Sequence, residues 1–547
     1  MDRDGVDRLL AEARIDGRRY RTALALLCDG DWWTLADLVR QSATSRRGVE
    51  ALLRALDPER SGDRFRLSPA DVETCRALLR ARGTFDGVPP GDPLGGSGGA
   101  AAEGSAAVAQ TADPVGHLLP RYAEVVARMR EAVEAAPRGR HELDHVSATP
   151  ETTVRRALLL GARFWLPGAR LLCVGDHDLT SLAVALVHPG VEVAVVDLDD
   201  RVLAHIDAQA RRLGVAVRTR WADLRLGLPP SLHGGADLAL TDPPYTPEGV
   251  GLFTARAVEG LRDHDTGRVL LAYGASERTP MLALKVQRAL HDLNLVYEAV
   301  FPDFNRYFGA EAIGSAADMY ILRPTTKTAP AVAARAARFG TAIYTRGPQA
   351  VESAGAARES SADALTDDPA FTPDVLVGDW PGQTLPGTPR VRLSPWLAKP
   401  YARPVERVAI AVPAGLEAAL PRLLLATRAA HVRAFLAAPP PGGIAAPLAP
   451  VYRLTVEAGR VDAVRLRPPT DPVDAVTREI LDSAHGKVGN TWREALIKAR
   501  GLTKRQARAL IADIAPWAAD ATPLDLPLHR LTSLPDAVRA CLARAAG

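Results

Sequence analysis

The stretch ARLLCVGDHDLTSLAVAL, residues 169–186, decides the fold. Its first half is a short apolar run that predicts a buried strand, and its second half has the apolar spacing of a helix. The chain turns between them at Gly175. Outward from this unit, the same alternation of strand and helix continues through further apolar runs, namely VEVAVVDLD, VAVRTRWAD, ADLALTD and GRVLLAYG. We therefore predict a doubly wound, mainly parallel α/β sheet of the Rossmann-like, methyltransferase type over residues 115–325.

Segments of different composition flank this region. Residues 1–82 combine short predicted helices with DPERSGDRFRLS, which reads as a wing, and so predict a winged helix-turn-helix domain. Residues 83–114 are rich in Gly, Ala, Pro and Ser and predict a flexible linker. Residues 326–380 are of low complexity, and we expect them to be partly flexible. Residues 381–547 predict an α+β extension without a recognisable catalytic constellation.

Two interpretations of the N-terminal unit remain open. Arg46 and Arg47 could begin a DNA-recognition helix. Alternatively, Glu50, Asp57 and Glu59 dilute the positive charge, which favours a docking domain of the same shape.

The overall composition narrows the class of protein. The 547 residues carry a net charge of only +3, so no overall field drives the chain onto nucleic acid or a membrane. The most apolar stretch, Val408 to Ala426, is broken by proline and charge, and the first ten residues lack a signal core. The four cysteines have no zinc spacing. We expect a cytoplasmic protein with no membrane contact and no metal.

The predicted strand ends carry acids suited to a nucleoside. Asp197 follows Gly175 by about 20 residues, the separation typical of an acid that binds ribose hydroxyls. Asp199 follows it, and Asp223 ends the third strand, where it could accept from an adenine amino group while Trp221 or Leu224 covers the ring.

The first turn favours a cationic ligand. Asp176 and Asp178 would repel a pyrophosphate by roughly 4 kcal/mol per contact, so a nicotinamide or flavin dinucleotide fits poorly and a sulfonium nucleoside fits well. Two aspartates also suit a donor whose tail is only an amine, as in decarboxylated S-adenosylmethionine. Alternatively, Asp178 only caps the helix that begins at Leu179.

The motif Asp242-Pro243-Pro244-Tyr245 predicts that an amine is alkylated. The prolines fix the backbone and remove donors, so that carbonyls and the Asp242 carboxylate can orient a nitrogen and accept its proton. Tyr245 can pack against an alkylammonium. The alternative is a tight turn at a strand end. The motif alone does not distinguish a DNA base from an aliphatic amine. The surroundings favour a polyamine, because the strand ends present many acids, namely Asp176, Asp178, Asp199, Asp200, Asp223, Asp242 and Glu248.

Four motifs together resemble the branched-chain polyamine synthases, or bis(aminopropyl)spermidine synthases. They are ELDHVSATPETTVRR, GDHDLTSLAVAL, DPPYTPEGVGLFTARAV and FPDFNRY, at residues 142–156, 175–186, 242–258 and 301–307. The resemblance covers roughly residues 15–325. It implies transfer of an aminopropyl group from decarboxylated S-adenosylmethionine to a secondary nitrogen of spermidine, with methylthioadenosine as by-product.

The resemblance also implies roles for single residues. Asp176 and Asp178 would face the aminopropyl group and the amine, and Asp242 and Tyr245 would hold the acceptor. Glu142, in the first motif, is a further candidate for substrate binding. The chain departs from the family at His177, where an Asp is common, which bears on the acceptor preference and on a second transfer.

Three hypotheses follow. The first is a polyamine aminopropyltransferase, with a polyamine as partner and a homodimer as one conceivable assembly. The second is an S-adenosylmethionine-dependent methyltransferase acting on an amino group of DNA, RNA or a small amine. The third is a DNA-binding regulator whose sheet senses a ligand.

Overall fold

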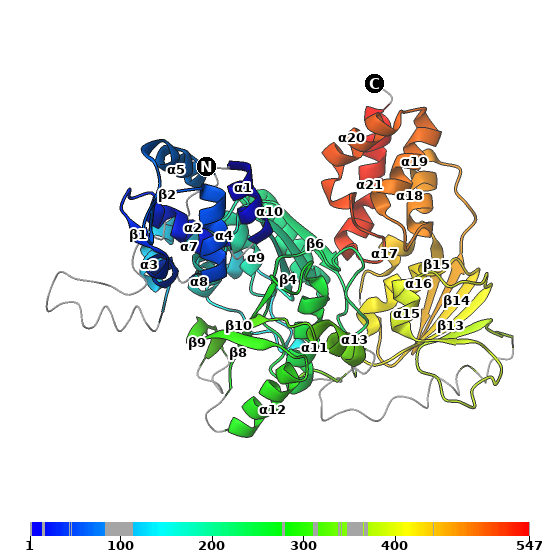
Figure 1. Cartoon of the computed structure of the whole chain (residues 1–547). Helices are drawn as coiled ribbons and strands as arrows, with labels where there is room; N and C mark the ends of the chain where they lie inside the picture. Colours follow the sequence, from blue (N-terminus) through cyan, green and yellow to red (C-terminus); the bar gives the residue numbers. More distant parts are fainter. Residues whose placement is uncertain are drawn as a thin grey trace.

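The computed structural model describes residues 3–13, 17–42, 44, 46–81, 113–275, 279–309, 315–336, 340, 342–346, 365, 370–440 and 442–545 (Figure 1). The predicted linker at 83–114 therefore lies outside the described residues except for 113 and 114. In the described part of the chain, no helix is long and apolar enough to cross a membrane.

The N-terminal unit is a small cluster of helices with a three-stranded antiparallel sheet in the order β1-β3-β2. Its elements are α1 (Arg3–Ala13), α2 (Gly17–Leu27), β1 (Trp33–Thr34), α3 (Leu35–Ser42), α4 (Arg46–Leu56), β2 (Glu59–Ser61), β3 (Arg64–Arg66) and α5 (Pro69–Ala81). The Thr34 hydroxyl accepts from the backbone N–H of Asp37 at 3.1 Å, as expected of a helix cap. The predicted wing is the hairpin β2–β3.

The central sheet has seven strands in the order β6-β5-β4-β7-β8-β10-β9. Its strands are β4 (Arg170–Val174), β5 (Glu192–Asp197), β6 (Val217–Trp221), β7 (Leu238–Thr241), β8 (Arg268–Tyr273), β9 (Val296–Arg306) and β10 (Ala316–Arg323). The first five in this order run parallel, and β10 and β9 are antiparallel additions at one edge. The α/β prediction is confirmed, and the sheet is mixed.

Alternating side chains of each strand feed two cores on opposite faces of the sheet. In β4, Leu171 and Cys173 enter one core, while Leu172 and Val174 enter the other. The first face is covered by α7 (Ala123–Glu134), α8 (Pro150–Arg163), α9 (Thr180–Val187) and α10 (Asp200–Leu213). The second face is covered by α11 (Pro247–Gly260), α12 (Pro280–His291) and α13 (Thr328–Ala336). Both faces of the parallel strands are buried, as the fold requires.

The C-terminal unit is built on a second mixed sheet, ordered β12-β11-β13-β14-β16-β15. Its strands are β11 (Val375–Val377), β12 (Arg390–Val391), β13 (Arg407–Val412), β14 (His431–Leu436), β15 (Tyr452–Glu457) and β16 (Arg460–Arg465). Its helices are α15 (Leu393–Ala398), α16 (Leu420–Leu425), α17 (Ala445–Leu448), α18 (Pro472–Asp482), α19 (Val488–Arg500), α20 (Lys504–Ile514) and α21 (Leu528–Arg544). Figure 1 shows these yellow to red elements beside β6 of the central sheet.

Part of the stretch at 326–380, expected to be partly flexible, forms a helix and buried contacts. Helix α13 packs on α11, and Ile343 and Tyr344 are buried against the second core. The low-complexity composition concealed these apolar anchors, because alanines and a few large residues suffice to dock a short helix.

Candidate active site

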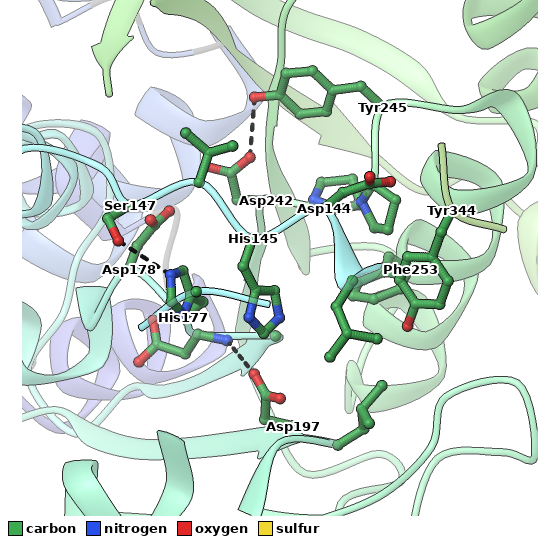
Figure 2. Close-up of a pocket in the computed structure, with 18 of the residues that line it drawn as sticks. Asp144, His145, Ser147, His177, Asp178, Asp197, Asp242, Tyr245, Phe253 and Tyr344 are labelled. Atoms are coloured by element: carbon green, nitrogen blue, oxygen red, sulfur yellow. Dashed lines mark hydrogen bonds between the residues drawn. The ribbon is translucent and has the colours of Figure 1, made fainter. Parts of the chain in front are cut away.

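A cavity of about 790 Å³ opens at the carboxyl ends of β4, β5, β6 and β7. This is the edge at which parallel α/β sheets bind ligands. Most of the candidate residues line it, namely Gly175, Asp176, Asp178, Asp197, Asp223, Asp242, Pro243 and Tyr245. Figure 2 shows side chains from several elements that converge on this space. Glu142 and Asp199 do not line it, although their neighbours do.

The turn after β4 presents a buried carboxylate. Gly175 has a φ of +70°, and a side chain there would meet the Phe253 ring, which explains the glycine. Asp176 accepts from the backbone N–H of Ser181 at 3.2 Å. Burial raises the pKa of Asp176 to about 8. Asp178 makes no cap contact with α9, so the capping alternative applies to Asp176 instead.

Asp197, at the end of β5, is held by the backbone. Its two oxygens accept from the backbone N–H groups of Asp176 at 3.0 Å and Asp199 at 2.8 Å. Burial raises the pKa of Asp197 to about 6. Each oxygen keeps a lone pair, so the carboxylate can still accept from a ligand. Asp199 instead caps α10 and pairs with Arg201, which explains why it lies outside the cavity lining.

Asp223 is already engaged by a cation. Arg225 donates to both Asp223 oxygens, at 2.7 and 2.5 Å, and both side chains are almost fully buried. The Trp221 ring does not line the cavity, whereas Leu198 and Leu224 do. Of the two residues considered as apolar cover, Trp221 and Leu224, only Leu224 lines the cavity, together with Leu198.

Asp242 lies at the centre of a hydrogen-bond network. Its carboxylate accepts from the hydroxyls of Tyr245 at 3.0 Å and Tyr307 at 2.8 Å, and from Arg156 Nη2 at 2.6 Å. The two hydroxyls are also 3.0 Å apart. Burial raises the pKa of Asp242 to about 7, against the opposing effect of Arg156. A carboxylate with this pKa can take up a proton near neutral pH.

Arg156 of α8 is the main residue that the sequence reasoning missed. Its guanidinium is fully buried and joins Asp242 to Asp178, whose oxygen it reaches at 2.9 Å. It also donates to Asn305, Thr180 and Tyr307. The available signal was a charged residue on the apolar face of a helix, since such residues are rarely buried without a partner.

Two histidines form one wall of the cavity. The rings of His145 and His177 stack with centroids 4.3 Å apart, and the His177 Nε2 lies 3.1 Å from the Ser147 hydroxyl (Figure 2). Burial lowers the pKa of both rings, that of His145 to about 3. The position at which the family commonly has Asp therefore carries a neutral imidazole near pH 7.

A segment beyond the predicted domain closes the opposite wall. The Ile343 carbonyl accepts from the Thr246 hydroxyl at 2.7 Å, and the Thr345 backbone N–H donates to Asp144 at 2.7 Å. Tyr344 lies between these anchors and faces the cavity (Figure 2). No local pattern predicted this wall, because it lies in the low-complexity stretch at 326–380.

The acids at this edge are mostly paired with arginines. Asp178 and Asp242 share Arg156, and the other pairs are Asp199 with Arg201, Asp200 with Arg422 and Asp223 with Arg225. Glu248 is exposed and does not line the cavity, and the exposed Glu142 pairs with Arg140. The uncompensated acidic tract inferred from the sequence is therefore much reduced.

Residues 124–344 match the sequence model of the branched-chain polyamine synthase A C-terminal domain. An uncharacterized protein of Methanocaldococcus jannaschii is 37% identical over 195 residues, which cover 36% of this chain and 49% of that protein. The N(4)-bis(aminopropyl)spermidine synthase of the same organism is 33% identical over 196 residues, covering 35% and 55%. The chain thus spans about half the length of these curated relatives.

Among solved structures, the branched-chain polyamine synthase of Thermus thermophilus, in complex with N4-aminopropylspermidine and 5'-methylthioadenosine, is 19% identical. The alignment covers 59% of this chain and 93% of that one, with a TM-score of 0.33. The resemblance inferred from the four motifs is confirmed by the domain match. That match begins at residue 124 and ends at 344, within the wall segment, whereas the motifs predicted a resemblance over roughly residues 15–325. Residues 15–123 lie outside the matched range.

Proposed function

We propose, from the premise that residues 124–344 form a branched-chain polyamine synthase domain, that this chain transfers an aminopropyl group from decarboxylated S-adenosylmethionine to a polyamine nitrogen. The observation that carries the proposal is that the Asp242 network and the acids of the β4 and β5 turns open into one cavity. Donor and acceptor could therefore meet there without a further movement of domains.

The donor half fits a cationic nucleoside. Burial disfavours the charged form of Asp176 and raises its pKa. A cation bound beside Asp176 would stabilise that charged form. The aminopropyl ammonium group would supply that cation. Asp197 would accept from the ribose hydroxyls, and Leu198 and Leu224 would pack on the adenine. Arg225 already donates to Asp223. Asp223 would therefore accept from the adenine amino group only through its remaining lone pairs.

Asp242 would act on the acceptor. An alkylammonium with a pKa near 10 must first lose a proton, at a cost of about 4 kcal/mol at pH 7. Tyr245 and the carbonyl of Pro243 would then orient the nitrogen. The lone pair of the nitrogen forms a bond to the propyl carbon, and the carbon–sulfur bond breaks with its electron pair passing to sulfur. Asp242 takes the proton that the ammonium loses before the attack, and the nitrogen keeps its other hydrogen, so the products are a tertiary ammonium ion and methylthioadenosine.

The pairing of the acids changes what supports a polyamine as the acceptor. Since arginines compensate most of them, charge attraction alone is a weak argument, and the domain match carries more weight. Asp144 and the ring of exposed Phe308 at the cavity would accommodate a second ammonium and an alkyl chain.

Mass spectrometry of the products tests the function. The full chain is incubated with spermidine, spermine or putrescine and with decarboxylated and intact S-adenosylmethionine side by side. We expect methylthioadenosine and a mass gain of one aminopropyl group from the decarboxylated donor only. Turnover of the intact donor alone would establish the methyltransferase hypothesis instead, and no turnover with any amine would falsify the transferase proposal.

The N-terminal unit is proposed to be a winged-helix docking domain. Helices α3 and α4 precede the hairpin β2–β3, the order of that domain. Arg46, at the start of α4, pairs with Glu50 at 2.8 Å, which lowers its availability for a phosphate. Specific DNA binding that is lost on deletion of residues 1–80 would support the regulator hypothesis.

A further inference from the structure

The C-terminal unit contacts the two loops that would hold the donor nucleoside. One loop follows β5, which ends at Asp197, and the other follows β6 and contains Asp223. Strand β6 lies at the edge of the central sheet, where its backbone would otherwise be open to solvent. Instead, the Trp221 backbone N–H donates to the Asp525 carbonyl at 2.7 Å. The C-terminal unit thus covers this edge beside the cavity.

Arg422 of α16 is the centre of the first contact. Its guanidinium donates to both oxygens of Asp200, at 3.0 and 3.1 Å, and its side chain is 1% exposed. Asp200 is the first residue of α10 and follows the β5 loop directly. The same guanidinium lies 4.0 Å from the centroid of the Trp221 ring. One buried arginine therefore holds the residue after the β5 loop, Asp200, and the residue before the β6 loop, Trp221.

Trp221 links the two loops to each other. Its indole N–H donates to the Leu198 carbonyl at 2.9 Å. Leu198 follows Asp197 in the chain and lines the cavity. A displacement of Trp221 would therefore move the apolar residue that packs on the nucleoside, although Trp221 itself does not line the cavity.

Arg225 forms the second contact. Besides pairing with Asp223, it donates to the Gly415 carbonyl, in the turn after β13, at 2.9 Å. The Tyr344 ring packs on its guanidinium at 5.5 Å. The orientation of the Asp223 carboxylate and the position of the Tyr344 wall thus both depend on a residue held by the C-terminal unit.

We infer that the C-terminal unit is a structural part of the donor site, in which Arg422 and Arg225 act as positioning residues that preorganise the nucleoside loops. The inference rests on the proposed function, because it takes the ligand of these loops to be the adenine nucleoside of the donor. Fixing the loops before binding lowers the ordering cost of binding, so the effect falls on donor affinity rather than on the chemical step.

Calorimetric titration with methylthioadenosine tests this inference on full-length variants. We expect Arg422→Gln to weaken nucleoside binding about tenfold and to raise the donor KM similarly, with kcat and the acceptor KM within about twofold of wild type. Arg422→Lys keeps the charge but not the planar fork of the guanidinium. Its nucleoside affinity should therefore lie between those of wild type and Arg422→Gln.

Arg433→Gln is the matched control. Arg433 also donates to a carboxylate, that of Asp462 at 2.8 Å, and lies 4.2 Å from the Phe371 ring, but within the C-terminal sheet. Its loss should cost comparable stability without weakening nucleoside binding. Wild-type affinity in folded Arg422→Gln would overturn the inference, and so would an equal loss of affinity in both variants.

Hydrogen exchange on the wild-type chain gives a readout that does not depend on how a variant folds. Methylthioadenosine should slow amide exchange in residues 217–226 and also in 413–417 and 522–528 of the C-terminal unit. Protection confined to the central sheet would refute the coupling. If the wild-type chain binds no adenine nucleoside, the proposed function fails and the inference fails with it. If wild type and Arg422→Gln bind the nucleoside equally well, only the inference fails.

Discussion

Replacing Tyr307 by Phe should shift the acid limb of the activity profile to higher pH. The Tyr307 hydroxyl donates to the Asp242 carboxylate at 2.8 Å and stabilises its charged form. Losing a hydrogen bond to a charged group costs about 1.5–3 kcal/mol, and 1.36 kcal/mol corresponds to about one pKa unit. Because Arg156 and Tyr245 still donate to Asp242, we take the lower end, a rise of about one unit.

The sign follows from the role proposed for Asp242, which must be ionised to take a proton. Its pKa of about 7 means that about half is ionised at pH 7 in the wild-type chain. After a rise of about one unit, roughly a tenth is ionised, so activity at pH 7 falls about fivefold. Near pH 9 both forms are almost fully ionised, and the difference should disappear.

The assay is methylthioadenosine release at saturating donor and acceptor between pH 5.5 and 9.5, with one acceptor throughout so that titration of the amine is common to both chains. Tyr273→Phe is the control. Tyr273 packs edge-on against Tyr245, with ring centroids 5.3 Å apart, and among the described residues its hydroxyl has no hydrogen-bond partner. An unshifted limb in Tyr307→Phe, or an equal loss at every pH, would refute the reasoning.

Three further substitutions test other parts of the site. Asp242→Asn should lower kcat by about 10²–10⁴ while the Kd for methylthioadenosine, measured by calorimetry, stays within about threefold; equal losses would reassign Asp242 to donor binding. His177→Asp adds the carboxylate common in the family, so we expect a lower KM for spermidine and more doubly transferred product by mass spectrometry; unchanged values would show that position 177 does not set acceptor preference. Arg156→Met leaves two buried carboxylates without their cation, so urea denaturation should show a loss of about 3–5 kcal/mol; near wild-type stability would mean that solvent reaches the pair.

The elements built from local pattern could be predicted from the sequence. The apolar run before Gly175 and the helical spacing after it predicted β4 and α9. The antiparallel pair β9 and β10 was not predicted. A strand's direction is set by its neighbour in the sheet, and that neighbour is not visible in the local pattern.

The candidate site was predicted in its acids but not in their partners. Asp176, Asp197 and Asp242 lie at strand ends, which the periodicity locates. Arg156 lies 22 residues before Asp178 and 86 before Asp242, so their pairing depends on packing between α8 and the sheet. For the same reason, the net charge of the cavity could not be summed from the sequence, and counting the acids as free overstated its negative charge.

The buried guanidinium of Arg156 has a consequence for how related sequences diverge. Its contacts with Asn305, Asp178, Thr180, Asp242 and Tyr307 employ every nitrogen of the side chain. Lysine offers three donors on one atom and could not reach these partners together. A change at any one position would therefore leave an unmet charge or donor at the others. We expect positions 156, 178 and 242 to vary as a set, which makes their joint occupancy a more selective signature for homology searches than Asp-Pro-Pro-Tyr alone.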